Sequence, residues 1–432
     1  TGALAVDGGT VKLDGPFPTG TQNTALGNDA LASGSLSGGY NTAIGDTALK
    51  TNTSGAANVA VGRDALELNT TGCQNTALGQ NTMYTNVSGD FNTAVGREAL
   101  YSNTTADNNT AVGHSALKAN TTGNNNTAFG CATMQTNTTG LRNVAVGRLA
   151  LQSNTTACCN VALGDAALYT NQTGFKNIAI GTNALYANTE DCNVAVGHLA
   201  MEGNTTGGCN TAVGTSSLTT NTTGASNTAI GHCAMVSNTT GAANNAVGCS
   251  ALVCNTEGVD NNAFGNKALC ANTTGDNNIA IGRLALRNNT TANENVGIGK
   301  EALCANQTGT ANTAVGTCSL KVNTASCNTS IGALSLRDNT TGCSNVAVGT
   351  NAMLVNTEGC FNTAVGRAAL DANLTGNRNV AIGLSALGSN TTADCNVAVG
   401  QSALGVNTTG ANNTAVGHIA LSANTTAADN TA

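Results

Sequence analysis

Cysteine is the residue type in this 432-residue chain with the clearest capacity for chemistry, because sixteen cysteines recur at related spacings. Three pairs lie 16 or 17 residues apart: Cys192 with Cys209, Cys254 with Cys270, and Cys343 with Cys360. A disulfide requires Cα atoms about 4.4 to 6.8 Å apart. A fold that stacks residues about 17 apart would meet this requirement. We therefore expect disulfides and an oxidising, extracellular setting, with plain replacement of Ser, Ala or Thr by Cys as the alternative.

Asparagine offers a second kind of chemistry, since Asn-Thr-Thr-Gly and its variants create many N-glycosylation sequons. Representative candidate acceptors are Asn69, Asn120, Asn272 and Asn407. The competing interpretation is that these asparagines form turns and stack on one another. Repeats about 4.8 Å apart leave little room for a file of bulky glycans, so stacking is the favoured interpretation.

No constellation of catalytic or metal-binding type stands out from the rest of the sequence. There is no CxxC pair and no Ser/His/Asp set, and Gly297-Ile298-Gly299-Lys300 lacks the spacing of a phosphate-binding loop. The four histidines, His114, His198, His232 and His418, share one place in a repeat and fit a solvated corner. We expect neither an enzyme nor a bound metal or cofactor.

These residues belong to a 17-residue unit that repeats from Asn23 to the end of the chain, while residues 1–22 form a separate lead-in segment. Each unit opens with Asn-x-Ala-aliphatic-Gly or a small variation of it. Of the 24 intervals between opening asparagines, 21 are 17 residues long, two are 16 and one is 18. Counting from the opening Asn as position 1, Gly occupies position 5, Ala-Leu positions 8 and 9, and Asn-Thr-Thr-Gly positions 12 to 15.

The unit predicts an all-β fold, a parallel β-solenoid of about 24 coils. It is too short for two helices, and positions 2 to 4 are β-like. We expect a second short strand at positions 8 to 10 and left-handed glycines at corner positions 5 and 15. Counting places Cys327, Cys343 and Cys360 equivalently in three successive coils, whereas Cys254 and Cys270 are one position out of step.

Composition limits the partners of such a solenoid. Charged residues make up 9% of the chain, and the net charge of -7 is dispersed, so no basic stripe could follow a nucleic-acid backbone. No apolar run reaches the roughly 18 residues of a membrane span. With no initiator Met or signal peptide, we expect the sequence to be part of something longer.

The apolar positions 3, 4, 8 and 9 are expected inside the coil or at an interface. Each coil can bury one Val or Ile, one Leu and two Ala. The free energy gained by burying them is small compared with the entropic cost of ordering about 17 residues. Stacked Asn at positions 1 and 12 would add ladders of side-chain hydrogen bonds. We expect association into a homo-oligomer, most simply a trimer.

The units Asn58-Val-Ala-Val-Gly62, Asn177-Ile-Ala-Ile-Gly181 and Asn379-Val-Ala-Ile-Gly383 resemble the head repeats of YadA-like trimeric autotransporter adhesins. They are also similar to repeats in phage and bacterial surface fibres. This resemblance implies a trimeric left-handed β-roll at a cell or virion surface that attaches to cells, matrix or glycans.

Three functions follow as expectations. The first is an extracellular structural and adhesive fibre, the shaft or head of an adhesin or tail fibre. The second is a filament subunit that stacks end to end through open strand edges, since the sequence stops within a unit. Ice binding ranks below both, because consecutive threonines at positions 13 and 14 would alternate between faces.

Overall fold

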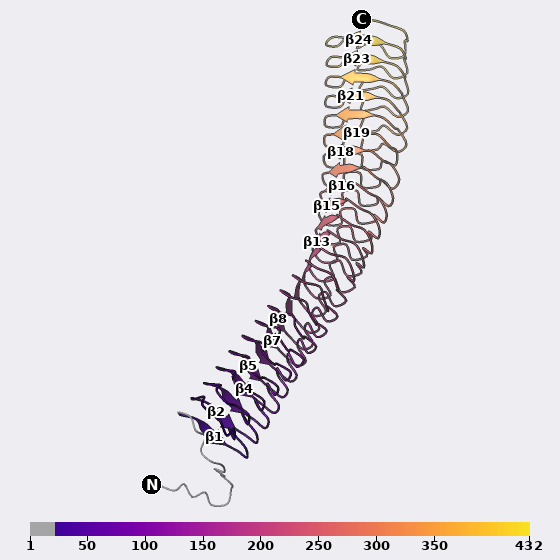
Figure 1. Cartoon of the computed structure of the whole chain (residues 1–432). Helices are drawn as coiled ribbons and strands as arrows, with labels where there is room; N and C mark the ends of the chain where they lie inside the picture. Colours follow the sequence, from indigo (N-terminus) through magenta and orange to yellow (C-terminus); the bar gives the residue numbers. More distant parts are fainter. Residues whose placement is uncertain (1–21) are drawn as a thin grey trace, which may run out of the picture. The chain divides into compact units, whose positions relative to one another are not determined.

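The computed structural model describes residues 22–432 and shows the predicted parallel β-solenoid (Figure 1). Two compact units divide the chain, the first ending at Cys209 and the second running from Asn210 to Ala432. No helix occurs among the residues that the structure describes, and hence none that could cross a bilayer. The predicted lead-in segment, residues 1–22, lies outside the described residues except for Gln22.

Every coil contributes one strand of three residues, at positions 2 to 4. The strands of the first unit are β1 (Thr24–Leu26), β2 (Thr42–Ile44), β3 (Val59–Val61), β4 (Thr76–Leu78), β5 (Thr93–Val95), β6 (Thr110–Val112), β7 (Thr127–Phe129), β8 (Val144–Val146), β9 (Val161–Leu163), β10 (Ile178–Ile180) and β11 (Val194–Val196). Those of the second unit are β12 (Thr211–Val213), β13 (Thr228–Ile230), β14 (Asn245–Val247), β15 (Asn262–Phe264), β16 (Ile279–Ile281), β17 (Val296–Ile298), β18 (Thr313–Val315), β19 (Thr329–Ile331), β20 (Val346–Val348), β21 (Thr363–Val365), β22 (Val380–Ile382), β23 (Val397–Val399) and β24 (Thr414–Val416).

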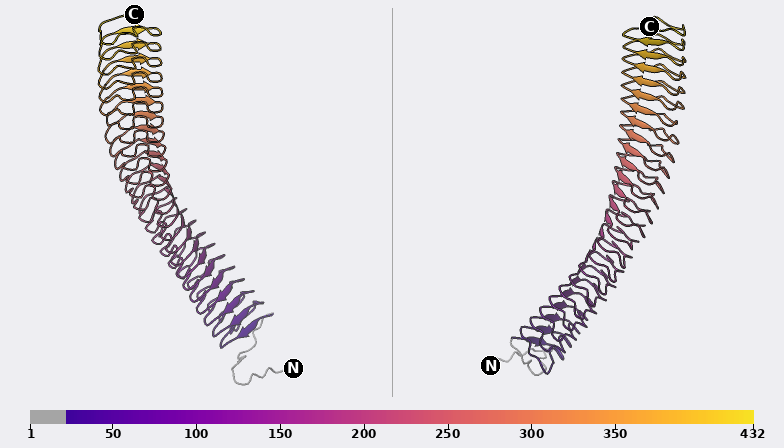
Figure 2. Two further views of the ribbon diagram at one scale, coloured as in Figure 1. Left: turned by 180° about the vertical axis from the view of Figure 1, so that it is seen from behind. Right: turned by 45° about the horizontal axis from the view of Figure 1, so that its top comes forward.

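Successive strands within each unit pair in parallel and in register, so equivalent positions stack. In the first unit Ala43 pairs with Ala60, and in the second Ala229 pairs with Ala246. The strands follow one side of each unit and the corners the other (Figure 2). This register places the same residue type above itself in coil after coil.

The core of each coil is narrow and is built from positions 3, 8 and 9. In a typical coil Ala111, Ala116 and Leu117 are completely buried. Methionine replaces leucine at position 9 in five coils, and these are all the methionines of the chain: Met83, Met134, Met201, Met235 and Met353. An unbranched side chain of similar volume fills the same space.

Two files of buried asparagine complete the interior. At position 12, Nδ2 of Asn69 donates to Oδ1 of Asn52 in the preceding coil (2.8 Å) and to the carbonyl of Gly72 in its own coil (3.0 Å). At position 1, the backbone N–H of Asn58 donates to Oδ1 of Asn41 (3.0 Å), and Nδ2 of Asn58 donates to the same Gly72 carbonyl (2.8 Å). The predicted Asn ladders therefore exist, and we call the first file the position-12 ladder.

The corners differ from the prediction in two respects. Positions 8 to 10 are not a strand, because the residues at positions 7 and 9 have left-handed backbone; Ser115 and Leu117 have φ of 56° and 51°. The left-handed corner residue near the end of the coil is position 17, such as Asn125 (φ 59°), and not the glycine at position 15. Gly113 at position 5 does have a positive φ, 135°, as predicted.

Candidate interaction surface

The outward side of the strands forms the most regular surface of the molecule. Because alternate residues of a strand face opposite sides, Ala at position 3 points inward while positions 2 and 4 point outward. Position 2 holds Thr, Val, Ile or Asn, and position 4 holds Val, Ile, Leu or Phe, in all 24 strands. Val146 and Ile281 at position 4 are 41% and 42% exposed. The prediction that position 4 lies inside the coil is wrong, and its alternative, an interface, remains. We call these two columns the strand face.

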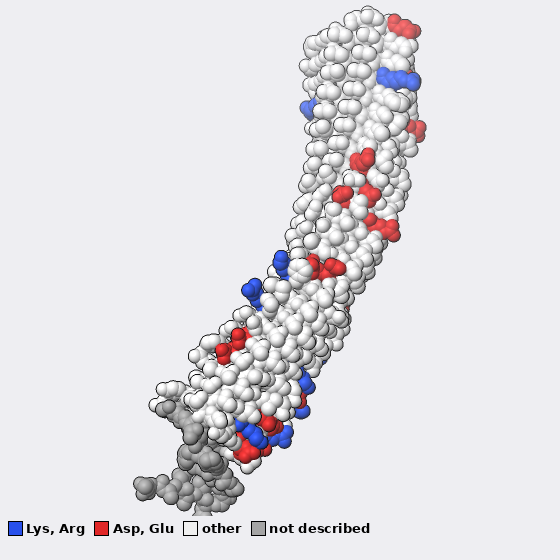
Figure 3. All heavy atoms as spheres, in the orientation of Figure 1, with Lys and Arg blue, Asp and Glu red and all other residues white. Residues whose placement is uncertain are grey.

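Charged side chains lie elsewhere. None of the 24 strands contains one, whereas positions 6, 7, 10 and 11 carry most of the Lys, Arg, Asp and Glu. The side of the molecule visible in Figure 3 shows scattered charged groups, with one mixed cluster near the N-terminal end, on a largely uncharged surface. The strand face is therefore an uncharged band flanked by polar corners.

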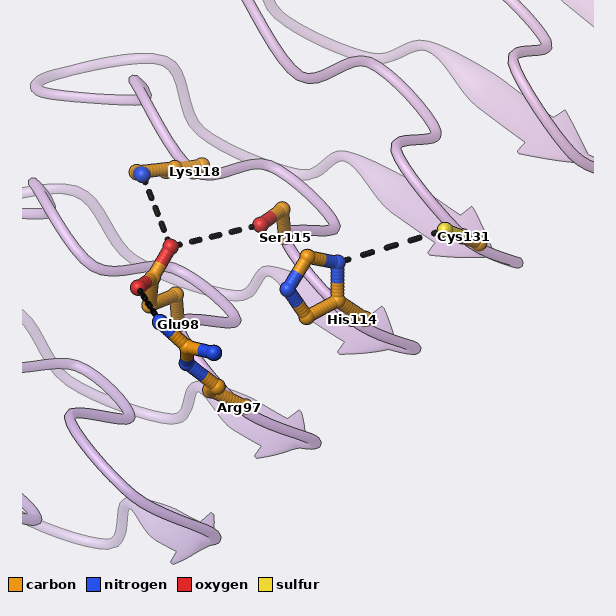
Figure 4. A network of polar contacts seen from close by, with 6 residues as sticks. All are labelled: Arg97, Glu98, His114, Ser115, Lys118 and Cys131. Carbon is orange, nitrogen blue, oxygen red and sulfur yellow. Dashed lines mark hydrogen bonds and ion pairs between the residues drawn. The ribbon is translucent and has the colours of Figure 1, made fainter.

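A polar network around Glu98 at one of these corners links two neighbouring coils (Figure 4). Glu98 accepts from Nζ of Lys118 (2.7 Å), from Arg97 (3.0 Å) and from Oγ of Ser115 (3.4 Å). The hydrogen bond from Lys118 is the main reason that the pKa of Glu98 lies below its usual value.

The second unit repeats this ion pair at the same positions. Glu301 at position 7 contacts Lys321 at position 10 of the next coil (2.9 Å), and this hydrogen bond again lowers the pKa of the glutamate. Both arrangements link neighbouring coils at the surface.

The histidines lie at exposed corners. His114 has Cys131 of the next coil 4.0 Å from Nδ1, and His232 has Cys233 3.7 Å from Nε2. In the described part of the chain no group of three His, Cys, Asp or Glu side chains could hold a metal ion. These are pairs on an open corner and do not form a convergent catalytic or metal site.

The cysteines separate into pairs of different geometry, and no disulfide is formed among residues 22–432. Cys343 and Cys360 occupy position 16 of adjacent coils with their sulfurs 3.1 Å apart. Cys192 and Cys209 share position 17 and are both exposed. Cys254 and Cys270 are neighbours through the bond from the N–H of Cys254 to the carbonyl of Cys270 (3.2 Å), but stand one position out of step as predicted.

Cys327 is not equivalent to Cys343. Its φ of 62° is that of position 17, and Ser326 takes the place equivalent to Cys343, because the N–H of Ser344 donates to the carbonyl of Ser326. The coil from Asn312 is one residue short, and the missing residue lies before Cys327 in the corner. Counting from the opening Asn therefore misplaced this cysteine.

The burial of the sequon asparagines contradicts the glycosylation interpretation. Asn69, Asn120, Asn272 and Asn407 are all completely buried. The nitrogen that would carry a glycan is in each case a donor within the position-12 ladder. A glycan on any of them would break the ladder and could not fit inside the coil.

Threonines of the same corner alternate as expected. At position 13 the hydroxyl of Thr121 donates to the carbonyl of Thr138 in the next coil (3.1 Å), while Thr122 at position 14 is exposed. Two stacked tyrosine pairs at position 10 escaped the sequence analysis: Tyr84 with Tyr101 and Tyr169 with Tyr186, with ring centroids 5.2 and 5.0 Å apart. Their equal positions in consecutive coils are the signal that could have revealed them.

No family model matches the chain, and no curated protein is significantly similar to it. Any functional proposal must therefore rest on the surfaces described above.

Proposed function

We propose that this chain is a subunit of an extracellular structural and adhesive fibre, in which copies associate side by side through the strand face. The observation that carries the proposal is the absence of any charged residue from 24 successive strands whose outward side chains are half-buried or exposed. If this outward surface faced water, selection for solubility would favour charged residues on it. Burial against other copies accounts for their exclusion.

The size of the strand face supports this association. At about 4.8 Å per strand, the face is about 50 Å long in the first unit and about 60 Å in the second. With a width of about 10 Å the faces offer about 500 and about 600 Å², so a stable interface of roughly 800 Å² per partner would engage both units. The resemblance to trimeric adhesin heads favours three copies, and the variable polar corners would then face a cell-surface, matrix or glycan ligand.

Sedimentation of the full chain tests the proposal. We expect the mass of an oligomer, and we expect the double variant Val146→Lys/Ile180→Lys to sediment as a smaller species, because it places two charges on the strand face. Thr156→Lys is the matched control, since position 14 is exposed and lies away from the strands. A stably folded monomer of the unmodified chain would contradict the proposal.

End-to-end growth into a filament is the alternative mode of assembly. It would use the strand edges at the ends of the solenoid and not the strand face. Electron microscopy distinguishes the two, because lateral association gives discrete particles of one length, whereas end-to-end growth gives continuous fibres.

A further inference from the structure

Two thiols of the second unit are held against each other by the stacking of their coils. Cys343 and Cys360 occupy the same position in coils that begin with β19 and β20, and their Sγ atoms are 3.1 Å apart. Both side chains are partly buried. Among cysteines of adjacent coils in the described chain, no other pair shows such a contact between sulfurs; Cys158 and Cys159 also contact each other, but as sequence neighbours within one coil.

The environment of position 16 explains why the sulfurs meet. At this position Asp or Asn accepts the backbone N–H of the residue at position 16 in the preceding coil, as Asp394 does from Asn377 (2.6 Å). Cys360 takes the same role, since its Sγ accepts the N–H of Cys343 (3.0 Å). The N–H of Cys360 in turn donates to Oδ1 of Asn377 (2.8 Å). These bonds direct the sulfur of Cys360 toward the preceding coil, where Cys343 lies.

The backbone already satisfies the geometry of a disulfide. Stacked strands place equivalent Cα atoms about 4.8 Å apart, within the range of about 4.4 to 6.8 Å that a disulfide allows. The two coils are tied on both sides of the cysteines, before them by Asn356 to Asn339 (2.7 Å) and after them by Asn362 to Asn345 (3.0 Å). Bond formation therefore requires only side-chain rotation.

We propose that Cys343 and Cys360 are a redox modification site that forms a disulfide between adjacent coils by exchange with a small disulfide such as oxidised glutathione. One cysteine thiolate attacks the oxidant, forming a mixed disulfide and releasing one glutathione thiolate. The second cysteine thiolate then attacks the protein sulfur of the mixed disulfide and releases the second glutathione thiolate. Two protein thiols are oxidised, one glutathione disulfide is reduced to two thiols, and the two thiol protons pass to the released thiolates through solvent.

The contact between the two sulfurs predicts that oxidised glutathione forms a disulfide at Cys343 and Cys360 in preference to the other candidate pairs. Cys192 and Cys209 project from exposed corners without a contact between their sulfurs, so each can retain a glutathione adduct. At Cys343 and Cys360 the neighbouring thiol displaces the adduct. Burial raises the pKa of the Cys360 thiol, and we therefore expect the reaction to accelerate as the pH rises.

Peptide mapping of the full folded chain after treatment with oxidised glutathione tests the site. Residues 338–367 lie between Arg337 and Arg367 and contain only these two cysteines, and Glu358 lies between them. We expect the tryptic peptide to lose two hydrogens and to resist alkylation. Further cleavage after Glu358 should leave two fragments linked until a reductant is added.

Cys343→Ser is the matched variant, and there Cys360 should retain glutathione as a stable adduct. The same treatment in urea should abolish the preference for this pair. The proposal is overturned if Cys343 and Cys360 stay reduced, or retain separate adducts, under conditions that oxidise Cys192 and Cys209. Linkage of either residue to a cysteine of another coil or another chain would equally overturn it.

Discussion

The side-chain amide of Asn188 donates to the carbonyl of Glu190, and Oδ1 of Asn171 in the preceding coil is buried without a donor. The coil that contains Asn188 is one of the two 16-residue coils, and the shorter corner draws its amide away from the position-12 ladder. The other short coil repeats the effect, because Asn323 donates to Ala325 and leaves Oδ1 of Asn306 unpaired. The short coil therefore interrupts the ladder in each unit, and in the first unit the bond from Asn171 to Asn154 in the preceding coils is missing as well.

This interruption predicts unequal costs for the same substitution at position 12. Asn120 donates to Asn103 and Gly123 and accepts from Asn137, so Asn120→Ala should lower the free energy of unfolding by about 3 kcal/mol at about 1 kcal/mol per bond. Asn171 makes a single such bond, to Gly174, and Asn171→Ala should cost about 1 kcal/mol. Urea unfolding of the two variants measures the difference. Equal losses would show that the ladder bonds do not carry this stability.

Gly113 should not tolerate alanine. Its φ is 135°, and an added Cβ would lie 2.3 Å from the carbonyl oxygen of Gly130 in the next coil. We expect Gly113→Ala to cost at least about 3 kcal/mol, because left-handed strain and a backbone clash add together. Gly208→Ala is the control, since its Cβ would meet only the carbonyl of Asp191 at 3.6 Å. Thermal unfolding should separate the two, and a small effect at Gly113 would mean that the corner has another conformation.

The left-handed residue at position 17 offers a stabilising change. Ala57 has φ of 57°, a conformation that costs a residue with Cβ about 1 kcal/mol. Ala57→Gly should therefore raise stability by about that amount. Ala119→Gly, at a position without a positive φ, should lower it by about 0.5 to 1 kcal/mol. Denaturant unfolding measures the change in the free energy of unfolding of each variant. Changes of opposite sign would confirm the corner geometry, and a loss of stability in both variants would contradict it.

The two Glu–Lys pairs predict an acid-sensitive contribution to stability. The folded pKa of Glu98 is below its usual value, so its contribution is present above the ordinary glutamate range and is lost as the pH falls through the lowered pKa. Glu98→Gln should therefore be less stable than the unmodified chain at neutral pH and should approach it in acid. Glu301→Gln should behave alike in the second unit. Thermal unfolding across the acid range measures this, and a difference that persists at low pH would exclude the ion pair as its cause.

Much of the fold follows from the sequence because the repeat is strict. The opening Asn-x-Ala-aliphatic-Gly, with Gly297 and Ser330 in place of Ala in two coils, predicted every strand. Stacking in register made the buried asparagines predictable from their constancy. The turn through Ser115 and Leu117 was not predictable, since left-handed Leu contradicts local backbone preference and depends on contacts between coils.

The candidate surfaces were harder to predict. An aliphatic residue at position 4 is equally suited to the core and to an interface with another chain. Only the three-residue strand in the structure shows that its side chain points outward. Likewise, Asn69 begins a glycosylation sequon in the sequence, and the sequon itself does not reveal whether the side chain is exposed or buried. The place of Cys327 depended on where a single residue had been lost, which counting cannot detect.

The position-12 ladder also gives each unit a dipole along its stacking direction. In the runs from Asn52 to Asn154, from Asn221 to Asn306 and from Asn323 to Asn424, the Nδ2 of every asparagine after the first donates to the coil before it and none donates to the coil after. The side-chain amide dipoles of each file are therefore aligned head to tail, as peptide dipoles are in a helix. Aligned hydrogen bonds polarise one another in a buried, weakly screened interior. Each unit of this weakly charged protein thus has a dipole along its own stacking direction, with the acceptor end of each file toward the C-terminal side.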